Sequence, residues 1–518
     1  MQKVEEFLAK YHLLIILVLA IPAIWALFVP GFFGASDDLH IAWLHELDVT
    51  LRAGQFPPRF VPDLSFGFGY PLFDFVFPLP FYIGEIFHLL GLTLVDSVKT
   101  VFLLSIPVSG YFMYKFLKEH TSVWLALAGA TLYIYTPYRA TDIYVRGAFG
   151  EAVAFIFPPL VAWAITKTSK ERSLKWIGIL GLGVGGLVLS HDIMAYMFIP
   201  FLVVLALIIS FNIRAFLGFV LGLLVSIYFW LPAVLESSLM KYDTVFNFVD
   251  HFPTIKQLIT PYFGYGASVP GPYDGMSFFL GAINIILIIL ALILFKRLNK
   301  ITVWALIMVA VSIVMMNFRS TFLWQHIPLI PYFQFPWRFL SLTTFATSIF
   351  VISLTNFKFG KYVGIVIILA AIILNFTDFK PHDFLGRTDA YYLDRYIPVP
   401  VASEEYLKTG EEYLRLPKAT EKRPTAVSPN VSLDSTFEVN TSIPKTIDYY
   451  KYDFPGWIAK VDGKEVNISA GKPYGQIEFQ VPAGKHTIKV AFQETPLRAV
   501  FDLVSLLGLA AAVTIIFI

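Results

Sequence analysis

Two adjacent carboxylates, Asp37 and Asp38, are the residues of this sequence best placed to do chemistry. They follow the first long apolar run and precede a helix predicted over 37–53. Carboxylates at a membrane boundary are costly unless they are solvated or paired. Such a group can act as a general base, or it can bind a hard divalent cation such as Mg²⁺ or Mn²⁺. The alternative is structural, because Ser36 and Asp37 also suit the N-cap of the following helix.

A second set of charged residues lies in the short segment YRATDIYVRGAFGE. Its arginines, Arg139 and Arg146, suit phosphate because a guanidinium presents forked N–H donors. Its carboxylates, Asp142 and Glu151, suit a cation. Together with the first pair, this segment supplies the predicted ligands of a Mg²⁺ or Mn²⁺ ion, which are Asp38, Asp142 and Glu151. The alternative is that the segment forms only local ion pairs at the interface.

Two further polar residues stand at the ends of apolar runs. His191, followed by Asp192, separates two such runs and could bind metal or accept a proton, or it could be a polar hinge. Arg338 follows Trp337 at the start of another run. It could contact a lipid phosphate, or its charged end could snorkel to the interface.

The composition indicates a membrane protein. The chain has 518 residues, of which 57% are hydrophobic and 15% charged, whereas soluble domains carry about 25% charged residues. The net charge of +2 gives no reason to expect nucleic acid as a partner. The absence of cysteine excludes disulfides and thiolate metal sites. No motif supports ATP hydrolysis or serine-type hydrolysis.

The apolar runs predict a polytopic α-helical membrane protein with about twelve spans. Shorter runs would need interfacial residues at their ends to complete a crossing. The predicted spans are 13–31, 97–117, 122–136, 151–167, 176–190, 192–210, 214–235, 278–295, 301–317, 337–356, 361–376 and 497–518.

The positions of lysine and arginine predict the orientation. Lys3 and Lys10 place the N-terminus in the cytoplasm by the positive-inside rule. If 76–92 does not cross, the clustered basic residues of the later short loops also fall on the cytoplasmic side. We therefore expect 76–92 and the amphipathic 37–53 to be interfacial helices within an outer loop, 32–96. Both termini are then cytoplasmic, and the candidate site lies on the outer face of the plasma membrane.

The composition changes near residue 377. Charged residues and prolines become frequent, and short alternating stretches such as STFEVN and KHTIKVAF follow. These predict an extracytoplasmic β-sandwich. The predicted organisation is a transmembrane domain over 1–376, a β-rich domain over 377–496 and a final span over 497–518.

Several stretches resemble bacterial membrane proteins labelled "6-pyruvoyl-tetrahydropterin synthase-related". Near the C-terminus, other stretches resemble the last domain of YfhO-like proteins. These families look like members of the GT-C glycosyltransferase superfamily, and the resemblance covers most of the chain. It rests on SDDLH (36–40), GQFPPRFVPDLSFGFGYPLFDF (54–75), PLPFY (78–82), DIYVRGAFGE (142–151), LSHD (189–192), FPWR (335–338), FPGWIAKVDGK (454–464) and VPAGKHTIKVAF (481–492).

The resemblance implies inverting transfer of a sugar from a polyprenyl-phosphate carrier to a glycan, lipid or protein acceptor of the cell envelope. In that superfamily the key acidic residue lies in the first outer loop, a position that Asp37 and Asp38 fill. Family members usually have His before this pair, where this chain has Ser36. The expected substrate-binding residues are Arg139, Arg146, His191 and Arg338.

Two other functions stay open at this point. Twelve spans would also suit a transporter or flippase of lipid-linked saccharides, although charges are scarce within the spans and no internal repeat is evident. A non-catalytic envelope assembly protein could instead use the β domain for binding.

Overall fold

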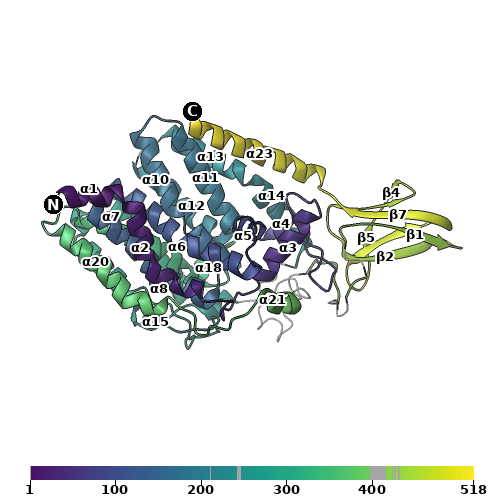
Figure 1. The fold of residues 1–518 in the computed structure, drawn as a ribbon, viewed down its shortest axis with the longest axis horizontal. Coiled ribbons are helices and arrows are strands. Elements are labelled where there is room, and N and C mark those ends of the chain that lie inside the picture. The colour runs from purple at the N-terminus through teal and green to yellow at the C-terminus, as the bar shows by residue number, and fades with distance from the viewer. Residues whose placement is uncertain are drawn as a thin grey trace.

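Most of the chain is helical, and a β region precedes the last helix (Figure 1). The computed structural model describes residues 2–209, 212–241, 247–396, 416–422, 424, 427–429 and 432–518. The helices pack side by side as a bundle, and the strands lie together at one end of it.

Each of the twelve predicted spans coincides with helical structure in the described part of the chain. Six stretches are long and apolar enough to cross a membrane alone: α6 (Leu94–Lys118), Phe149–Lys170 with α9 (Phe149–Ala154) and α10 (Phe157–Lys170), α12 (Asp192–Ile209), Pro336–Leu354 with α19 (Leu340–Ile349), Gly360–Asp378 with α20 (Gly360–Asn375), and α23 (Pro496–Phe517). Three bent pairs also qualify: α1 (Gln2–Lys10) with α2 (His12–Ile24), α13 (Ile213–Val225) with α14 (Ile227–Glu236), and α17 (Lys300–Met315) with α18 (Thr321–His326). Shorter apolar helices are α7 (Val123–Tyr135), α11 (Lys175–Ser190) and α16 (Ala282–Ile293). The number of crossings and their direction stay predictions.

Glycines let three of these helices approach closely. A Cβ at Gly222 of α13 would lie 2.8 Å from the carbonyl oxygen of Gly181 in α11. A Cβ at Gly178 would lie 2.4 Å from the carbonyl oxygen of Ala512 in α23. Small residues at helix contacts are typical of membrane bundles, because van der Waals packing between backbones stabilises the association there.

The predicted interfacial segments form α3 (His40–Arg52) and α5 (Leu79–Leu89), with the short α4 (Leu72–Phe75) between them. Helix α3 differs from the expectation of one apolar face turned to the membrane. Most of its residues are buried, including Glu46 and, on its polar side, Asp48. Other protein segments cover that side. One of them is α21 (Asp389–Tyr396), whose Asp389 carboxylate also accepts hydrogen bonds from the first N–H groups of α6 at 3.0 and 2.9 Å.

The C-terminal β region consists of two antiparallel sheets with facing side chains. One sheet has the order β1-β7-β3-β4 and the other β2-β6-β5. The ring of Tyr449 lies between the sheets, near Phe437 and Trp457. Asp462, Gly463 and Gly484 have positive φ angles, which suit the tight turns between these strands. The strands are β1 (Asp434–Thr441), β2 (Lys445–Tyr452), β3 (Trp457–Val461), β4 (Lys464–Val466), β5 (Ser469–Ala470), β6 (Gln476–Val481) and β7 (Gly484–Phe492).

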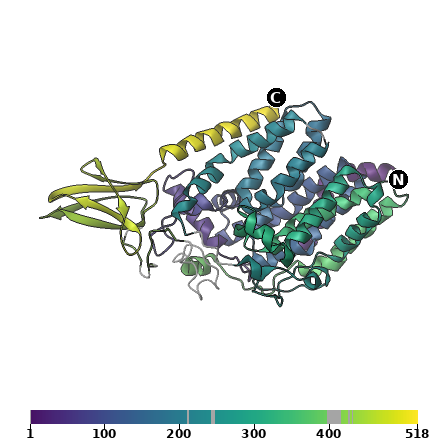
Figure 2. The same ribbon diagram turned by 180° about the vertical axis from the view of Figure 1, so that it is seen from behind.

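The β region lies beyond α3 and α4, and α23 returns from it along the bundle (Figures 1 and 2). Lys451 of β2 enters the loop of residues 32–96, the predicted first outer loop, and donates to the carbonyl oxygens of Pro62 and Gly67, both at 2.8 Å. The Tyr452 amide donates to the Phe68 carbonyl at 2.9 Å. Aromatic rings complete the contact: Phe60, Phe454, Trp457 and Phe492.

A buried ion network fixes the same junction. Arg59 of the outer loop contacts Asp502 of α23 at 2.7 Å and Asp74 of α4 at 3.5 Å. Arg498 of α23 donates to Glu236 of α14 at 3.0 Å and lies 3.7 Å from Asp74. These pairs hold the outer loop, α14 and α23 together at the place where the β region connects to the bundle.

Candidate functional site

The first outer loop lies directly against the segment that carries Arg146. This segment is a π-helix, Thr141–Arg146, and it ends at Gly147 with a φ of 71°. A Cβ at Gly147 would lie 2.9 Å from the Cβ of Ala35 and 3.1 Å from the carbonyl oxygen of Asp37. Glycine is therefore required by both the left-handed backbone and the close approach.

Arg146 is held by two carboxylates and an aromatic ring. Its side chain donates to Asp142 at 2.9 Å and to Glu151 at 2.8 Å. The guanidinium lies over the ring of Trp337 at 4.6 Å from its centroid. Tyr138 donates its hydroxyl to Glu151 at 2.9 Å. All of these side chains are buried, which strengthens the ion pairs and makes them depend on one another.

Glu151 also joins Arg338 and His191 to this cluster. Nε of Arg338 lies 3.3 Å from Glu151, and Nε2 of His191 lies 3.9 Å from it. Nδ1 of His191 accepts from the amide of Met194 at 3.2 Å, which places the proton of the neutral ring on Nε2, facing Glu151. Burial lowers the pKa of His191 to about 4, so the ring is neutral at pH 7.

Asp37 borders this cluster through its backbone. Its amide donates to the Arg146 carbonyl oxygen at 2.6 Å, and the Ser36 amide donates to that of Val145 at 3.1 Å. The side chain is half-buried and interacts electrostatically with Arg338. The first outer loop thus presents Asp37 beside the arginines.

Asp38 has a different environment from Asp37. It is 3% exposed and pairs with Arg387 at 2.8 Å. Arg387 is positioned by backbone hydrogen bonds to Phe32 in both directions, at 2.8 and 3.2 Å. The capping interpretation is wrong for α3, because its N-cap is Leu39, without a side-chain cap bond.

Arg139 does not join the cluster around Glu151. Its side chain is fully buried, donates to Ser109 at 3.3 Å and lies over the ring of Phe155 at 4.2 Å. It approaches the other charged groups only through a Coulomb interaction with Asp142. Its role as a substrate contact stays a prediction.

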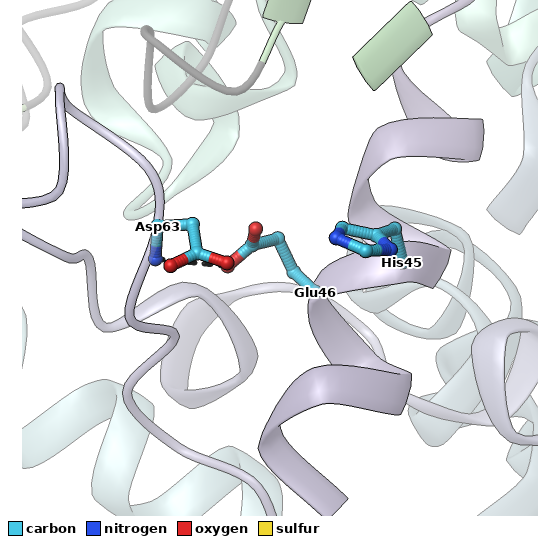
Figure 3. Close-up of side chains that lie close together, drawn as sticks. All are labelled: His45, Glu46 and Asp63. Atoms are coloured by element: carbon cyan, nitrogen blue, oxygen red, sulfur yellow. Dashed lines mark hydrogen bonds between the residues drawn. The ribbon is translucent and has the colours of Figure 1, made fainter. Parts of the chain in front are cut away.

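The residues predicted to bind Mg²⁺ or Mn²⁺ do not fit a shared ion in their present arrangement. Asp142 and Glu151 both hold Arg146, and Asp38 holds Arg387 elsewhere. A cation at this position would have to displace a guanidinium from each carboxylate. Among the residues that the structure describes, the one group of three potential ligands with converging atoms is His45, Glu46 and Asp63 (Figure 3).

The sequence interpretation missed several residues around the site. Arg387 does not belong to a recognisable motif, and it lies 349 residues after its partner Asp38 in the sequence. The sequence interpretation also missed His40, which lies two residues after Asp38. Burial and the nearby His191 and Arg146 lower its pKa to about 3. Lys451 had a detectable signal, because it is a lone lysine at an inward position of an aromatic strand.

Apolar helices, a β region and a buried polar cluster beside the first outer loop define a multi-pass membrane protein. No family model matches the chain. An uncharacterised protein of Lactococcus lactis subsp. cremoris (strain MG1363) is 28% identical over 210 residues, which are 39% of this chain and 34% of that protein. The match therefore spans about a third of the relative's length.

Among solved structures, the chain is similar to the mycobacterial arabinofuranosyltransferase AftD, determined by single-particle cryo-EM. The TM-score is 0.48 at 13% identity, over 72% of this chain and 27% of that chain. A TM-score below 0.5 does not establish a shared fold, and no activity is transferred from this likeness.

Proposed function

We propose that this chain is a membrane glycosyltransferase of the outer face. It would transfer a sugar from a polyprenyl-phosphate donor to a glycan, lipid or protein acceptor of the envelope. The observation that carries the proposal is the contact between Asp37 and the segment of Arg146, with Arg338 beside both. A potential base and two potential phosphate ligands then meet in one place. The resemblance to GT-C enzymes in the same stretches supports the proposal independently.

The chemistry needs only groups that this site could supply. The acceptor hydroxyl oxygen attacks the anomeric carbon of the donor sugar, and its proton passes to a carboxylate. The bond between that carbon and the phosphate oxygen breaks, and its electron pair leaves with the polyprenyl phosphate. The donor carries its own leaving group, so the transfer consumes no ATP. A guanidinium near the leaving oxygen stabilises the charge that develops there.

Asp37 is our candidate for the base. A base must touch the acceptor hydroxyl, and the side chain of Asp37 is half-buried whereas Asp38 is 3% exposed and held by Arg387. We assign Asp38 the role of a positioning residue, because its pair with Arg387 fixes the backbone next to Asp37. Both aspartates are needed in this scheme, for different reasons.

Arg146 and Arg338 are our candidates for the phosphate contact. They share Glu151 as a partner, and Asp142 also holds Arg146. Burial and the neighbouring Glu151 raise the pKa of Asp142 and favour its neutral form, which leaves positive charge for a donor phosphate to balance. His191 is neutral and contributes a hydrogen-bond donor rather than a charge. No step of this scheme passes through a metal ion.

The test uses the purified full chain in lipid nanodiscs. The readout is release of polyprenyl phosphate from a panel of polyprenyl-phospho-sugars, with an extract of cell-envelope glycans and lipids as acceptor. Asp37→Asn should abolish release, because the acceptor proton then has no base. The control is Asp96→Asn, which changes an exposed carboxylate of the same outer loop that contacts only Thr93 and Lys99. This variant should retain release.

Two results would reject the proposal. Release that is unaffected by Asp37→Asn and by Asp38→Asn would remove the site assignment. Absence of release with every donor, together with movement of the carrier lipid across liposomes, would identify a flippase instead.

A further inference from the structure

Three potential metal ligands converge in the first outer loop, away from Asp37 and the arginine cluster. His45 and Glu46 lie on α3, and Asp63 lies in the loop that follows it (Figure 3). One ligand atom from each side chain lies within 4.8 Å of the others. Figure 3 shows the Glu46 carboxylate directed at Asp63.

The potential ligand atoms of this group make few hydrogen bonds to the described residues. Glu46 is fully buried, and its Oε1 has no hydrogen-bond partner, whereas Oε2 accepts from the Asp63 amide at 3.3 Å. No hydrogen bond joins the His45 ring or the Asp63 carboxylate to another described residue. A buried carboxylate oxygen without a partner costs free energy. A cation bound between these side chains would satisfy it.

The loop of Asp63 is fixed before any ligand arrives. Lys451 of the β region donates to the carbonyl oxygens of Pro62 and Gly67, on either side of Asp63. Its ammonium also interacts electrostatically with Asp63 and Glu46. A bound divalent cation would stabilise the ionised form of both carboxylates. His45 and Asp63 are half-buried, which leaves an approach from solvent.

We propose that His45, Glu46 and Asp63 bind a divalent transition-metal ion of the Mn²⁺ or Zn²⁺ type. One imidazole nitrogen with two carboxylate oxygens is a mixed ligand set that suits these ions, whereas Mg²⁺ and Ca²⁺ prefer oxygen alone. The ion ties α3 to the loop on which the β region rests. The proposal is independent of sugar transfer, because none of these residues belongs to the proposed catalytic cluster.

The test measures metal in the full chain directly. Protein in nanodiscs is stripped with a chelator and titrated with Mn²⁺, and bound ion is counted by electron paramagnetic resonance. We expect one Mn²⁺ per chain, with affinity reduced about tenfold or more in Glu46→Gln and Asp63→Asn. Glu85→Gln is the matched control: Glu85 is a buried carboxylate of α5 that also has an unpartnered oxygen but lies outside the group. Its affinity should equal that of the unsubstituted chain.

A second measurement does not depend on the acidic variants folding well. Pulsed resonance on the unsubstituted, Mn²⁺-loaded chain should show coupling to one imidazole ¹⁴N, and His45→Ala should remove it. Absence of stoichiometric binding of both Mn²⁺ and Zn²⁺ would overturn the proposal. So would a bound ion without imidazole coupling, or an affinity unchanged by Glu46→Gln and Asp63→Asn.

Discussion

Replacing Glu151 by glutamine tests whether this carboxylate holds two buried arginines together. Its Oε1 lies 2.8 Å from Arg146 and 3.3 Å from Arg338, and its Oε2 accepts from Tyr138 at 2.9 Å. A glutamine can place its carbonyl oxygen toward both arginines and its amide toward the Tyr138 hydroxyl, which can accept. The hydrogen-bond geometry is then retained, and only the negative charge is lost.

Burial determines the magnitude of the effect. Glu151 is 1% exposed, so Glu151→Gln leaves one guanidinium without a full counter-charge in a region of low dielectric. Breaking a buried pair from one side costs about 3–5 kcal/mol, and the retained hydrogen bonds place the expected loss near about 3 kcal/mol. The matched control is Glu119→Gln. Glu119 pairs with Lys167 and Lys170, both at 2.9 Å, but at a partly exposed position. Such pairs contribute less than about 1 kcal/mol.

The assay is reversible unfolding in mixed micelles with increasing amounts of a denaturing detergent, followed by tryptophan fluorescence. Trp337 lies under Arg146 and reports on the cluster itself. We expect a clearly lower unfolding midpoint for Glu151→Gln than for Glu119→Gln. Equal midpoints for the two variants would refute the reasoning, because each carboxylate pairs with two cationic side chains and the Glu151 site is the more buried.

Three further predictions concern the outer loop and its contacts. The pKa of His40 falls from 6.5 to about 3 on folding, so the unfolded chain binds more protons between these values. Stability should therefore decrease as pH falls below 6.5, by no more than about 5 kcal/mol in total. Thermal unfolding measured from pH 7.5 to 5 tests this, and His40→Phe should weaken the dependence of stability on pH. Lys451→Met should increase proteolytic cleavage of residues 54–70, because two buried carbonyl oxygens lose their hydrogen-bond donor. Each loss costs about 1–3 kcal/mol. Removal of a buried cation partly offsets this destabilisation. Gly147→Ala should lower sugar transfer more than Gly54→Ala does, since both positions have positive φ but only Gly147 faces the backbone of Asp37, whereas nothing lies within 4 Å of a Cβ at Gly54.

The helices could be predicted because membrane-spanning segments follow from composition. Backbone groups in lipid must be paired within the segment, so a long apolar run is almost always a helix. Breaks within a helix are less visible. The bends of 64° after Val225 and 87° after Met315 follow no single residue type, and only packing in three dimensions shows them.

The polar cluster could be predicted only where it is local in the sequence. Asp142, Arg146 and Glu151 lie within ten residues, so their proximity follows from helical spacing. Each carboxylate pairs with an arginine. These contacts fit the interpretation as local ion pairs as well as the interpretation as a functional site. The pairing of Asp38 with Arg387 and of Lys451 with the loop around Asp63 depends on the tertiary fold. No periodicity connects residues that far apart.

The burial of α3 shows why a polar face can be misread. The pattern of Trp43 and Leu47 opposite His45 and Asp48 predicts a helix at the membrane surface, with its polar side in water. In the structure Arg52 on that side is exposed, whereas Asp48 is buried, and Glu46 on another flank of the helix is fully buried. A sequence pattern shows which face of a helix is polar. It does not show whether that face contacts water or other parts of the protein.

Charge balance connects these observations to the proposed chemistry. Ion pairs join Arg146 to Asp142 and Glu151, and Arg338 to Glu151, which gives the buried arginines partners of opposite charge. A donor phosphate would compete with Glu151 for the guanidinium of Arg338, whose Nε lies 3.3 Å from the Glu151 carboxylate. Donor binding would then shift the electrostatic environment of Asp37, which already interacts with Arg338. In the proposed scheme Arg338 therefore couples the base to the phosphate contact, and substitution of Arg338 should alter donor affinity and the pH dependence of transfer together.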